Sequence, residues 1–258
     1  MSDELVAVEH SGGVATVTLR RPSSRNVLSA ALVHAIGDTY DKLESDPRVR
    51  AVVLTGEGSA FCAGAKLSTL EASAAGDFDS VKEIYEGFLR VLHSPLVTIG
   101  AINGPAVGAG FNLALACDVR LAGESARFDT RFAKLHLHPG GGHTWLLAKA
   151  VGQQQATLAC LFGEVWDAQT ARKHGLVAEV YPDNALLPAA TSLAHRLDDQ
   201  NPDFTRLVTT SIRGALTTPS HQQALESEAR AQQWSAKQPE FLGGLRVIQD
   251  QIAARRRG

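Results

Sequence analysis

The chain has 258 residues, of which 44% are hydrophobic and 20% are charged. This is enough apolar material for one large core, or for a core with a small appendage. The 25 basic and 27 acidic residues nearly cancel, which argues against partners recognised through strong charge, such as nucleic acid or an anionic membrane surface. The three cysteines include no CxxC pair and favour a reducing compartment over a disulfide framework.

The first ten residues, MSDELVAVEH, carry acidic side chains and no apolar run, so a secretory signal peptide is not expected. No stretch of the sequence approaches the ~18 continuous apolar residues of a membrane-spanning helix. We therefore expect a cytoplasmic protein without a nucleic-acid or membrane partner.

Strand and helix patterns alternate along the first part of the chain. The β-branched run at residues 14–19 predicts a strand. Ser29 is then expected to cap a helix that reaches about residue 44, because apolar residues follow it at helical spacing. A further helix is expected to begin at residues 108–110. Short buried strands are predicted at residues 51–55, 97–102, 119–122 and 177–180.

The later segments change in character. Residues 69–80 are small and polar, and they predict a loop that lies over a site. Asp167 is expected to cap a short helix that ends at Gly175. After about residue 192 only helical patterns follow. The order of elements predicts an α/β core over residues 1–192 and a helical C-terminal appendage over residues 193–258.

Two Gly-rich turns follow predicted strands. The first turn spans residues 60–65 (AFCAGA), and the second turn spans residues 103–110 (NGPAVGAG). Small residues let a ligand approach the backbone, and the first N–H groups of a helix have no partner within the helix. Such groups can stabilise an oxyanion, although a turn of this kind can equally serve tight packing. Neither turn has the spacing of a P-loop or a dinucleotide-binding fingerprint.

The two turns, in this order, resemble those of the crotonase (enoyl-CoA hydratase/isomerase) superfamily. The resemblance covers almost the whole chain and includes the segments RPSSRNVL, AVVLTG, AINGPAVGAGFNLALACDVRLA and DAQTARKHGLVAEV. It implies an α/β fold, a crotonase-like spiral of ββα units with a C-terminal helical region. It also implies a homotrimer or hexamer and an acyl-CoA thioester as substrate. Coenzyme A is then part of the substrate, and neither a cofactor nor a metal is implied.

The resemblance also implies roles for individual residues. The backbone N–H groups of Ala65 and Ala109 would form an oxyanion hole for the thioester carbonyl, with Ala109 at a position where the family usually has Gly. Lys66 stands where the family usually has Asp. The resemblance implies further substrate-binding residues. In the two turns these are Ala63, Gly64, Gly108 and Gly110, and in the loop near the coenzyme A nucleotide they are Arg25 and Asn26.

Three positions that carry carboxylates in related enzymes differ in this chain. The two hydratase glutamates are replaced by Asn112 and Phe132, and a carboxylate used by some members is replaced by Gly140. Each general acid or base contributes about 10²–10⁴ in rate, so hydration of ordinary enoyl-CoA is expected to be weak or absent. Two functions remain open. One is a lyase or isomerase of fatty acid metabolism that acts through a thioester enolate or oxyanion, and the other is a non-catalytic acyl-CoA carrier or sensor.

The histidine-rich run at residues 134–143 (KLHLHPGGGH) offers substitutes for the missing carboxylates. His136 and His138 lie between two of the replaced positions, so either is a candidate acid–base group that would act together with Asn112. Both histidines can instead be loop residues that face solvent or another subunit. A thiol nucleophile at Cys62 and a metal held by the histidines are further alternatives.

Overall fold

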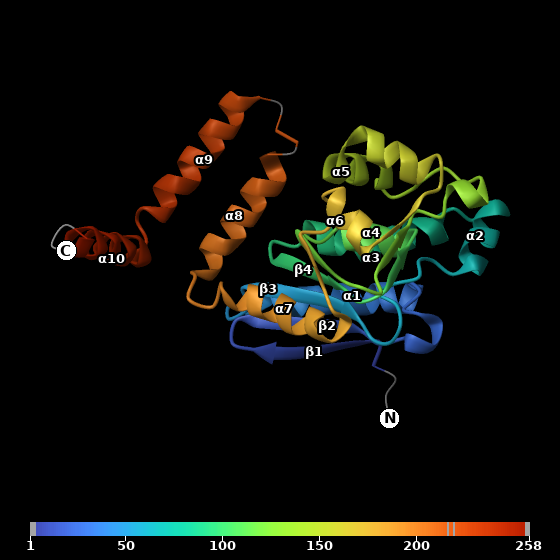
Figure 1. Ribbon diagram of the computed structural model, residues 1–258, viewed down its shortest axis with the longest axis horizontal. Helices are drawn as coiled ribbons and strands as arrows, with labels where there is room; N and C mark the ends of the chain where they lie inside the picture. The colour runs from blue at the N-terminus through green and yellow to red at the C-terminus, as the bar shows by residue number, and fades with distance from the viewer. Residues whose placement is uncertain (1–3, 216, 219, 256–258) are drawn as a thin grey trace. The chain divides into compact units, whose positions relative to one another are not determined.

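The computed structural model describes residues 4–215, 217–218 and 220–255 (Figure 1). It divides into two compact units, Met1–Asp198 and Asp199–Gly258. Within the described residues, no helix is both long enough and apolar enough to cross a bilayer.

The first unit is built on a six-stranded sheet with the strand order β1-β2-β3-β4-β6-β9. β1 pairs with β2 in antiparallel orientation, and the other neighbouring pairs are parallel. Parallel strands need crossover connections, which the intervening helices provide. The strands are β1 (Val6–Ser11), β2 (Val14–Leu19), β3 (Ala51–Gly56), β4 (Val97–Ile102), β6 (Val119–Gly123) and β9 (Glu179–Tyr181).

A smaller sheet has the strand order β5-β7-β8. β5 (Pro105–Val107) is parallel to β7 (Arg127–Asp129), which is antiparallel to β8 (Val165–Asp167). The chain passes from β4 to β5 within the second turn, so this turn joins the two sheets. An isolated parallel bridge between Cys62 and Ala106 brings the first turn to the edge of the smaller sheet.

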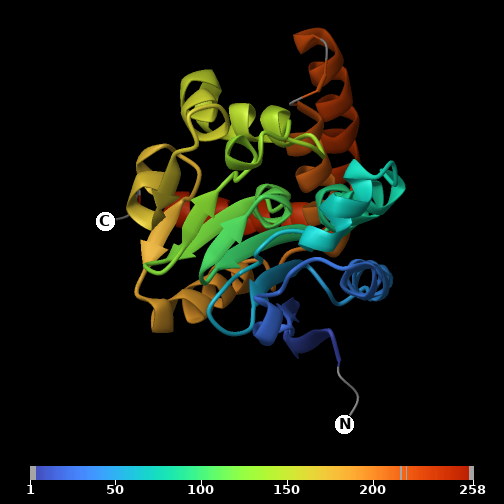
Figure 2. The same ribbon diagram turned by 90° about the vertical axis from the view of Figure 1, so that its right-hand side faces the viewer.

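One face of the six-stranded sheet is covered by α7 (Asp183–His195), as Figures 1 and 2 show. Side chains of a strand alternate between the two faces, so every second residue points toward this helix. Val14 and Val53 belong to the cluster that contains Leu186 and Ala190 of α7. The boundary predicted between residues 192 and 193 lies inside this helix.

The other face of the sheet carries the larger core. Val17, Val52 and Leu54 pack there with side chains of α1 and α3. Each large apolar side chain that is buried in this way contributes roughly 1.5–3 kcal/mol to folding. The remaining helices of the first unit are α1 (Ala30–Ser45), α2 (Leu67–Ala74), α3 (Asp79–His93), α4 (Ala109–Leu115), α5 (His143–Cys160) and α6 (Ala168–Lys173), with 3-10 turns η1 (Pro22–Ser24) and η2 (Ala133–Leu135).

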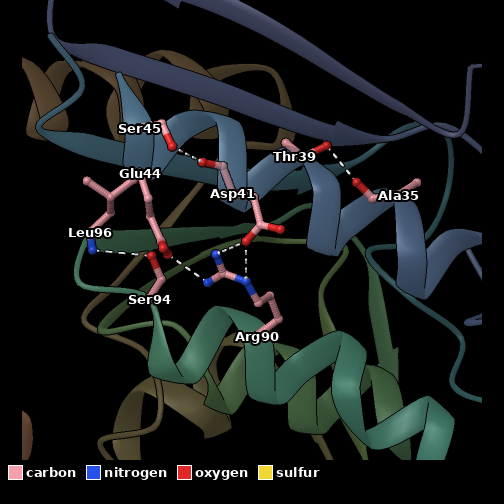
Figure 3. A network of polar contacts seen from close by, with 8 residues as sticks. All are labelled: Ala35, Thr39, Asp41, Glu44, Ser45, Arg90, Ser94 and Leu96. Carbon is pink, nitrogen blue, oxygen red and sulfur yellow. Dashed lines mark hydrogen bonds and ion pairs between the residues drawn. The ribbon is translucent and has the colours of Figure 1, made fainter. Parts of the chain in front are cut away.

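An ion-pair network fixes α3 on α1 (Figure 3). The Arg90 guanidinium of α3 lies 2.6 Å from Asp41 and 2.6 Å from Glu44, both on α1. The hydrogen bonds to Glu44 and Asp41 raise the pKa of Arg90. The helices also approach closely, because a Cβ added at Gly87 of α3 would lie 3.0 Å from Val33 of α1. The position of α3 matters for the site because this helix forms part of the cavity wall described below.

Several predicted elements are confirmed. β2 and β4 occupy the predicted ranges 14–19 and 97–102. The Ser29 hydroxyl accepts a hydrogen bond from the third residue of α1, and the Asp167 carboxylate accepts one from the third residue of α6. α6 is followed by Gly175 with φ 78°, a conformation that costs glycine little. Local capping chemistry therefore places these helix ends correctly.

The loop predicted at residues 69–80 is wrong. α2 runs over Leu67–Ala74, the chain turns at Gly76 with φ 105°, and α3 begins at Asp79. Alanine and leucine are strong helix formers, and α2 packs against α3, so tertiary contact stabilises a short helix in a segment that is poor in apolar periodicity.

The second unit is helical, as the sequence predicts. It consists of α8 (Pro202–Ala215), α9 (His221–Ser235) and α10 (Pro239–Arg255). α8 packs against α9, and the Ser220 hydroxyl caps α9 by accepting a hydrogen bond from the Gln223 N–H. Several large apolar side chains of this unit are exposed in the single chain.

Candidate functional site

A cavity of ≈ 500 Å³ in the first unit brings the two Gly-rich turns together. The first turn contributes Ala63, Gly64 and Ala65 to its lining, and the second turn contributes Gly108 and Ala109. Most of the remaining wall is apolar and comes from α2, from α3 and from the segment around η2. Its large apolar side chains are Leu67, Leu70, Phe78, Val81, Ile84, Phe132, Leu135 and Leu137.

The backbones of the two turns touch. The Val107 N–H donates a hydrogen bond to the Cys62 carbonyl oxygen at 3.0 Å. A Cβ added at Gly64, where φ is 98°, would lie 2.7 Å from the Val107 oxygen and 3.7 Å from the Ala109 nitrogen. A Cβ added at Gly110 would overlap the Cys62 carbonyl oxygen. Glycine is therefore required at both positions for this approach.

Two backbone N–H groups at the cavity, those of Ala65 and Ala109, have no acceptor among the described residues. Ala109 is the first residue of α4, and Gly108 with φ 52° turns the chain into that helix. The Gly64 carbonyl accepts a hydrogen bond from the Leu28 N–H at 2.7 Å, so the N–H of the same trans peptide, that of Ala65, points away from Leu28. In the part of the chain that the structure describes, neither the Ala65 nor the Ala109 N–H donates to a protein group.

Asn112, for which the resemblance implies a carboxylate, is almost fully buried. Its Nδ2 donates to the Gly140 carbonyl at 3.1 Å, so its Oδ1 is the atom that faces His143 Nδ1 at 2.5 Å. An amide oxygen can only accept, which puts the imidazole proton on Nδ1 and leaves Nε2 bare. Within the described residues, Nε2 is buried without a hydrogen-bond partner.

His143 is also the neighbour of the second replaced position. Its ring lies 5.2 Å from the Phe132 ring and 5.2 Å from the Phe111 ring, centroid to centroid. Burial lowers the pKa of His143 from 6.5 to about 4, so the imidazole is neutral at neutral pH. The structure thus brings Asn112 and Phe132, the two residues for which the resemblance implies glutamates, to one buried, neutral histidine. No Asp or Glu is among the described residues that line the cavity.

The burial of His143 was not predicted from the sequence. This histidine begins α5 directly after Gly141 and Gly142, which both adopt positive φ. The contact with Asn112 spans 31 residues of sequence, and no local pattern encodes it. The predicted candidates lie differently. His138 lines the cavity and is exposed, whereas the exposed His136 is absent from the lining.

The loop before α1 lies outside the cavity lining. Asn26 is fully buried, its Oδ1 accepts from the Arg21 N–H at 2.8 Å, and its Nδ2 donates to the Ala60 carbonyl at 2.9 Å. The carbonyl of the exposed Arg25 accepts from the Ala63 N–H at 2.9 Å. These contacts attach the loop to the first turn.

Lys66, which the resemblance places beside the first turn, is exposed and precedes α2 without lining the cavity. The thiol of Cys62 is fully buried, and burial raises its pKa to about 12. It therefore stays protonated and is a poor nucleophile at neutral pH. The described residues contain no group of three or more His, Cys, Asp or Glu side chains that could hold a metal ion.

The family model for enoyl-CoA hydratase/isomerase matches residues 9–247. The chain belongs to the enoyl-CoA hydratase/isomerase family. A Mycobacterium tuberculosis (strain ATCC 25618 / H37Rv) protein described as "Probable enoyl-CoA hydratase EchA14" is 42% identical over 240 residues, which cover 92% of this chain and 94% of the relative. The 1,2-epoxyphenylacetyl-CoA isomerase of Escherichia coli (strain K12) is 32% identical over 238 residues, which cover 90% of each chain.

A crystal structure of an enoyl-CoA hydratase from Bacillus anthracis has a TM-score of 0.89 and 30% identity, and the match covers 96% of each chain. This likeness confirms the predicted crotonase-like α/β fold. The enoyl-CoA hydratase/isomerase family acts on acyl-CoA thioesters. The cavity between the two turns is therefore the candidate binding site for an acyl group.

Proposed function

We propose that the chain binds an acyl-CoA thioester with the carbonyl oxygen between the N–H groups of Ala65 and Ala109. One observation carries the proposal: two touching turns each bring to one cavity an N–H donor for which the described residues supply no acceptor. A Cβ added at Gly64 would lie only 3.7 Å from the Ala109 nitrogen. The two turns are therefore close enough for both N–H groups to donate to one oxygen. Each donor of this kind contributes about 3–4 kcal/mol to the stabilisation of an oxyanion.

Two donors on the carbonyl oxygen favour reactions in which that oxygen becomes negative. Removal of a proton from the carbon next to the thioester gives an enolate, and addition of a nucleophile to the carbonyl gives an oxyanion. Ala109 begins α4, so the positive end of the helix dipole adds to the effect. The reaction class is that of an enoyl-CoA lyase or isomerase, in keeping with the names of the relatives.

Hydration of ordinary enoyl-CoA is expected to be weak or absent. Asn112 has both its amide oxygen and its amide nitrogen in hydrogen bonds, and Phe132 has no polar atom. No described cavity residue is a carboxylate that could take a proton from water. The same observation favours a second candidate function, a non-catalytic acyl-CoA carrier or sensor, which needs the oxyanion donors only for binding.

The apolar side chains of the cavity wall favour binding of an apolar acyl group. Leu70, Val81 and Ile84 line the cavity beside the two turns. Binding sites of this size are usually apolar surfaces with a few placed polar groups, and here the backbone supplies two of those groups.

The predicted homotrimer or hexamer is also part of this proposal. Phe241, Leu242, Val247 and Ile248 of α10 are each about half exposed in the single chain, and exposed apolar surface of this kind is typical of assembly contacts. Sedimentation of the purified chain tests the assembly, and a monomer would contradict it.

The experiment is a titration with butyryl-CoA beside free coenzyme A, followed by turnover assays on enoyl-, dienoyl- and β-ketoacyl-CoA thioesters. Ala109→Pro removes one donor at the first helical position, where proline is tolerated, and Ala109→Gly is the matched control that keeps the N–H. We expect Ala109→Pro to lower turnover by about 10²–10³ and Ala109→Gly to retain it. Tight binding without any turnover would favour the carrier function, and absence of acyl-CoA binding would contradict both.

A further inference from the structure

A serine, a histidine and an aspartate meet at the surface of the first unit, away from the cavity. Ser11 ends β1 at the hairpin that joins β1 to β2, and His195 ends α7. Asp198 lies in the turn after α7, where its N–H donates to the His195 carbonyl. Ser11 is exposed, the other two side chains are partly exposed, and none of the three lines the cavity. Reagents in solution can therefore reach this cluster.

The side chains of the cluster are hydrogen-bonded in a defined order. His195 Nδ1 lies 2.8 Å from Asp198 Oδ2, and His195 Nε2 lies 3.4 Å from the Ser11 hydroxyl oxygen. An ionised carboxylate only accepts, so the proton of the neutral imidazole is on Nδ1, and Nε2 accepts from the Ser11 hydroxyl. Contacts between a nucleophile and its base are often this long when no substrate is bound. The order of hydroxyl, imidazole and carboxylate is that of nucleophilic serine enzymes.

The hairpin holds the Asp198 carboxylate in place. Its Oδ1 accepts from the Gly13 N–H at 3.1 Å, and a Cβ added at Gly12 would lie 2.9 Å from its Oδ2. Although burial acts in the opposite direction, the hydrogen bonds from His195 and Gly13 lower the pKa of Asp198. The carboxylate is therefore ionised at neutral pH and is fixed where it orients the imidazole.

The turn also supplies a backbone donor next to the hydroxyl in the chain. Gly12 follows Ser11 with φ 55°, and its N–H donates to no group among the described residues. In α/β hydrolases, the N–H of the residue after the nucleophilic serine is one of the groups that stabilise the oxyanion. The Gly12 N–H is in the corresponding place of the chain.

We propose that Ser11 is a nucleophilic serine that takes the acyl group of a carboxylic ester, with His195 as its general base and Asp198 as a positioning residue. The Ser11 oxygen forms a bond to the carbonyl carbon of the ester, while its proton passes to His195 Nε2. The bond between that carbon and the alcohol oxygen then breaks, and Nε2 returns the proton to the leaving alcohol. The product is an acyl-serine, and the site does not depend on the function proposed for the cavity.

The test uses p-nitrophenyl acetate as the ester. Absorbance follows the release of p-nitrophenol, and mass spectrometry of peptides locates the acetyl group. We expect acetylation of Ser11 in the wild type, and loss of the corresponding release of p-nitrophenol in Ser11→Ala. Ser45→Ala is the matched control, because the exposed Ser45 hydroxyl donates to the Asp41 carbonyl at 2.8 Å instead of to a histidine. It is expected to be acetylated at Ser11 as fast as the wild type.

A second pair of variants tests the base. His195→Gln is expected to lower the rate of Ser11 acetylation by about 10²–10⁴, the usual contribution of a general base. His34→Gln is the matched control, because the exposed His34 lies 3.4 Å from Glu83 and contacts no serine hydroxyl among the described residues. Acetylation that leaves Ser11 unmodified, or equal rates at Ser11 in the wild type and in His195→Gln, overturns the inference.

Asp198→Asn tests the positioning role. The amide can turn its NH2 group toward Nδ1, which moves the imidazole proton to Nε2 and leaves the Ser11 hydroxyl without an acceptor. We expect the rate of Ser11 acetylation to fall by about 10² or more, and the nitrogen-15 resonances of His195 to report the change of tautomer. A variant that keeps both the wild-type tautomer and the wild-type rate overturns the role of Asp198.

Discussion

Two walls of the same cavity differ in how freely their residues can change. The main-chain wall consists of Gly64, Ala65, Gly108 and Ala109, and the side-chain wall consists of Asn112, Phe132 and Gly140. The main-chain wall depends on backbones in contact, so an added Cβ at Gly64 meets the carbonyl of Val107 at 2.7 Å. In the side-chain wall the close neighbours are side-chain atoms, such as the Tyr85 hydroxyl that a Cβ added at Gly140 would meet. At these three positions, for which the family resemblance implies carboxylates, the chain carries an amide, a phenyl ring and a hydrogen. A substitution at a glycine of the main-chain wall therefore has to move backbone, whereas a substitution in the side-chain wall has to move only a side chain.

The largest effect is expected from breaking the main-chain wall. In Gly110→Ala the new methyl group overlaps the Cys62 carbonyl oxygen, so the two turns must separate. We expect turnover of any acyl-CoA substrate to fall by at least about 10²-fold, because the donors lose alignment, and stability to fall by about 1–3 kcal/mol. Denaturant unfolding and steady-state rates measure both quantities.

The matched control for this change is Gly37→Ala in α1, where nothing lies within 4 Å of the added methyl group. It is expected to leave turnover unchanged and to raise stability by up to about 1 kcal/mol, because alanine is the better helix former. If Gly110→Ala behaved like Gly37→Ala, the close approach of the turns would not hold the site.

The next effect concerns the side-chain wall. Asn112→Glu combined with Phe132→Glu places carboxylates at the two positions for which the resemblance implies hydratase glutamates. We expect crotonyl-CoA hydration to rise by about 10² or more over the wild type, the usual contribution of a general acid or base. Spectrophotometric assay of the enoyl thioester measures it. Each single variant serves as a control, and a folded double variant without any gain would show that the missing carboxylates do not limit hydration.

A smaller effect is expected from the pH dependence of stability. The pKa of His143 is about 4 in the folded protein, compared with 6.5 for an unperturbed histidine such as that of the unfolded chain. Between pH 4 and pH 6.5 the unfolded chain therefore binds more protons than the folded protein. The contribution of neutral His143 to the free energy of unfolding is complete above about pH 6.5 and is lost as the pH falls toward 4. The loss amounts to up to about 3 kcal/mol for this one group.

Denaturant unfolding of the wild type and of His143→Gln between these pH values measures this effect, and the variant is expected to show the flatter curve. The comparison between the two proteins removes the titration of surface carboxylates that both share. Parallel curves would mean that His143 is not held neutral by burial.

The smallest effect is expected at the loop histidines. His138 lines the cavity, and His136 does not. His138→Ala is therefore expected to change turnover by a few-fold, well below the about 10²–10⁴ of a general acid or base, and His136→Ala is expected to leave it unchanged. Equal and large losses in both variants would instead support the predicted acid–base role of this pair.

The same contrast explains what the sequence could predict. Ser29 and Asp167 mark helix starts through contacts within three residues, and both Gly-rich turns are recognisable as continuous strings. The α2 helix was not predicted, because its stability depends on packing against α3. The burial of His143 and the place of the Tyr85 hydroxyl depend on contacts between distant segments, so neither follows from any local pattern.

The most direct test of the oxyanion site is the infrared carbonyl band of butyryl-CoA labelled with ¹³C at the thioester carbon. Two N–H donors on the oxygen weaken the C=O bond, so the bound band is expected at lower frequency than in water. In Ala109→Pro the band is expected to move back toward its position in water. A bound band at the frequency found in water, or above it, would contradict the account.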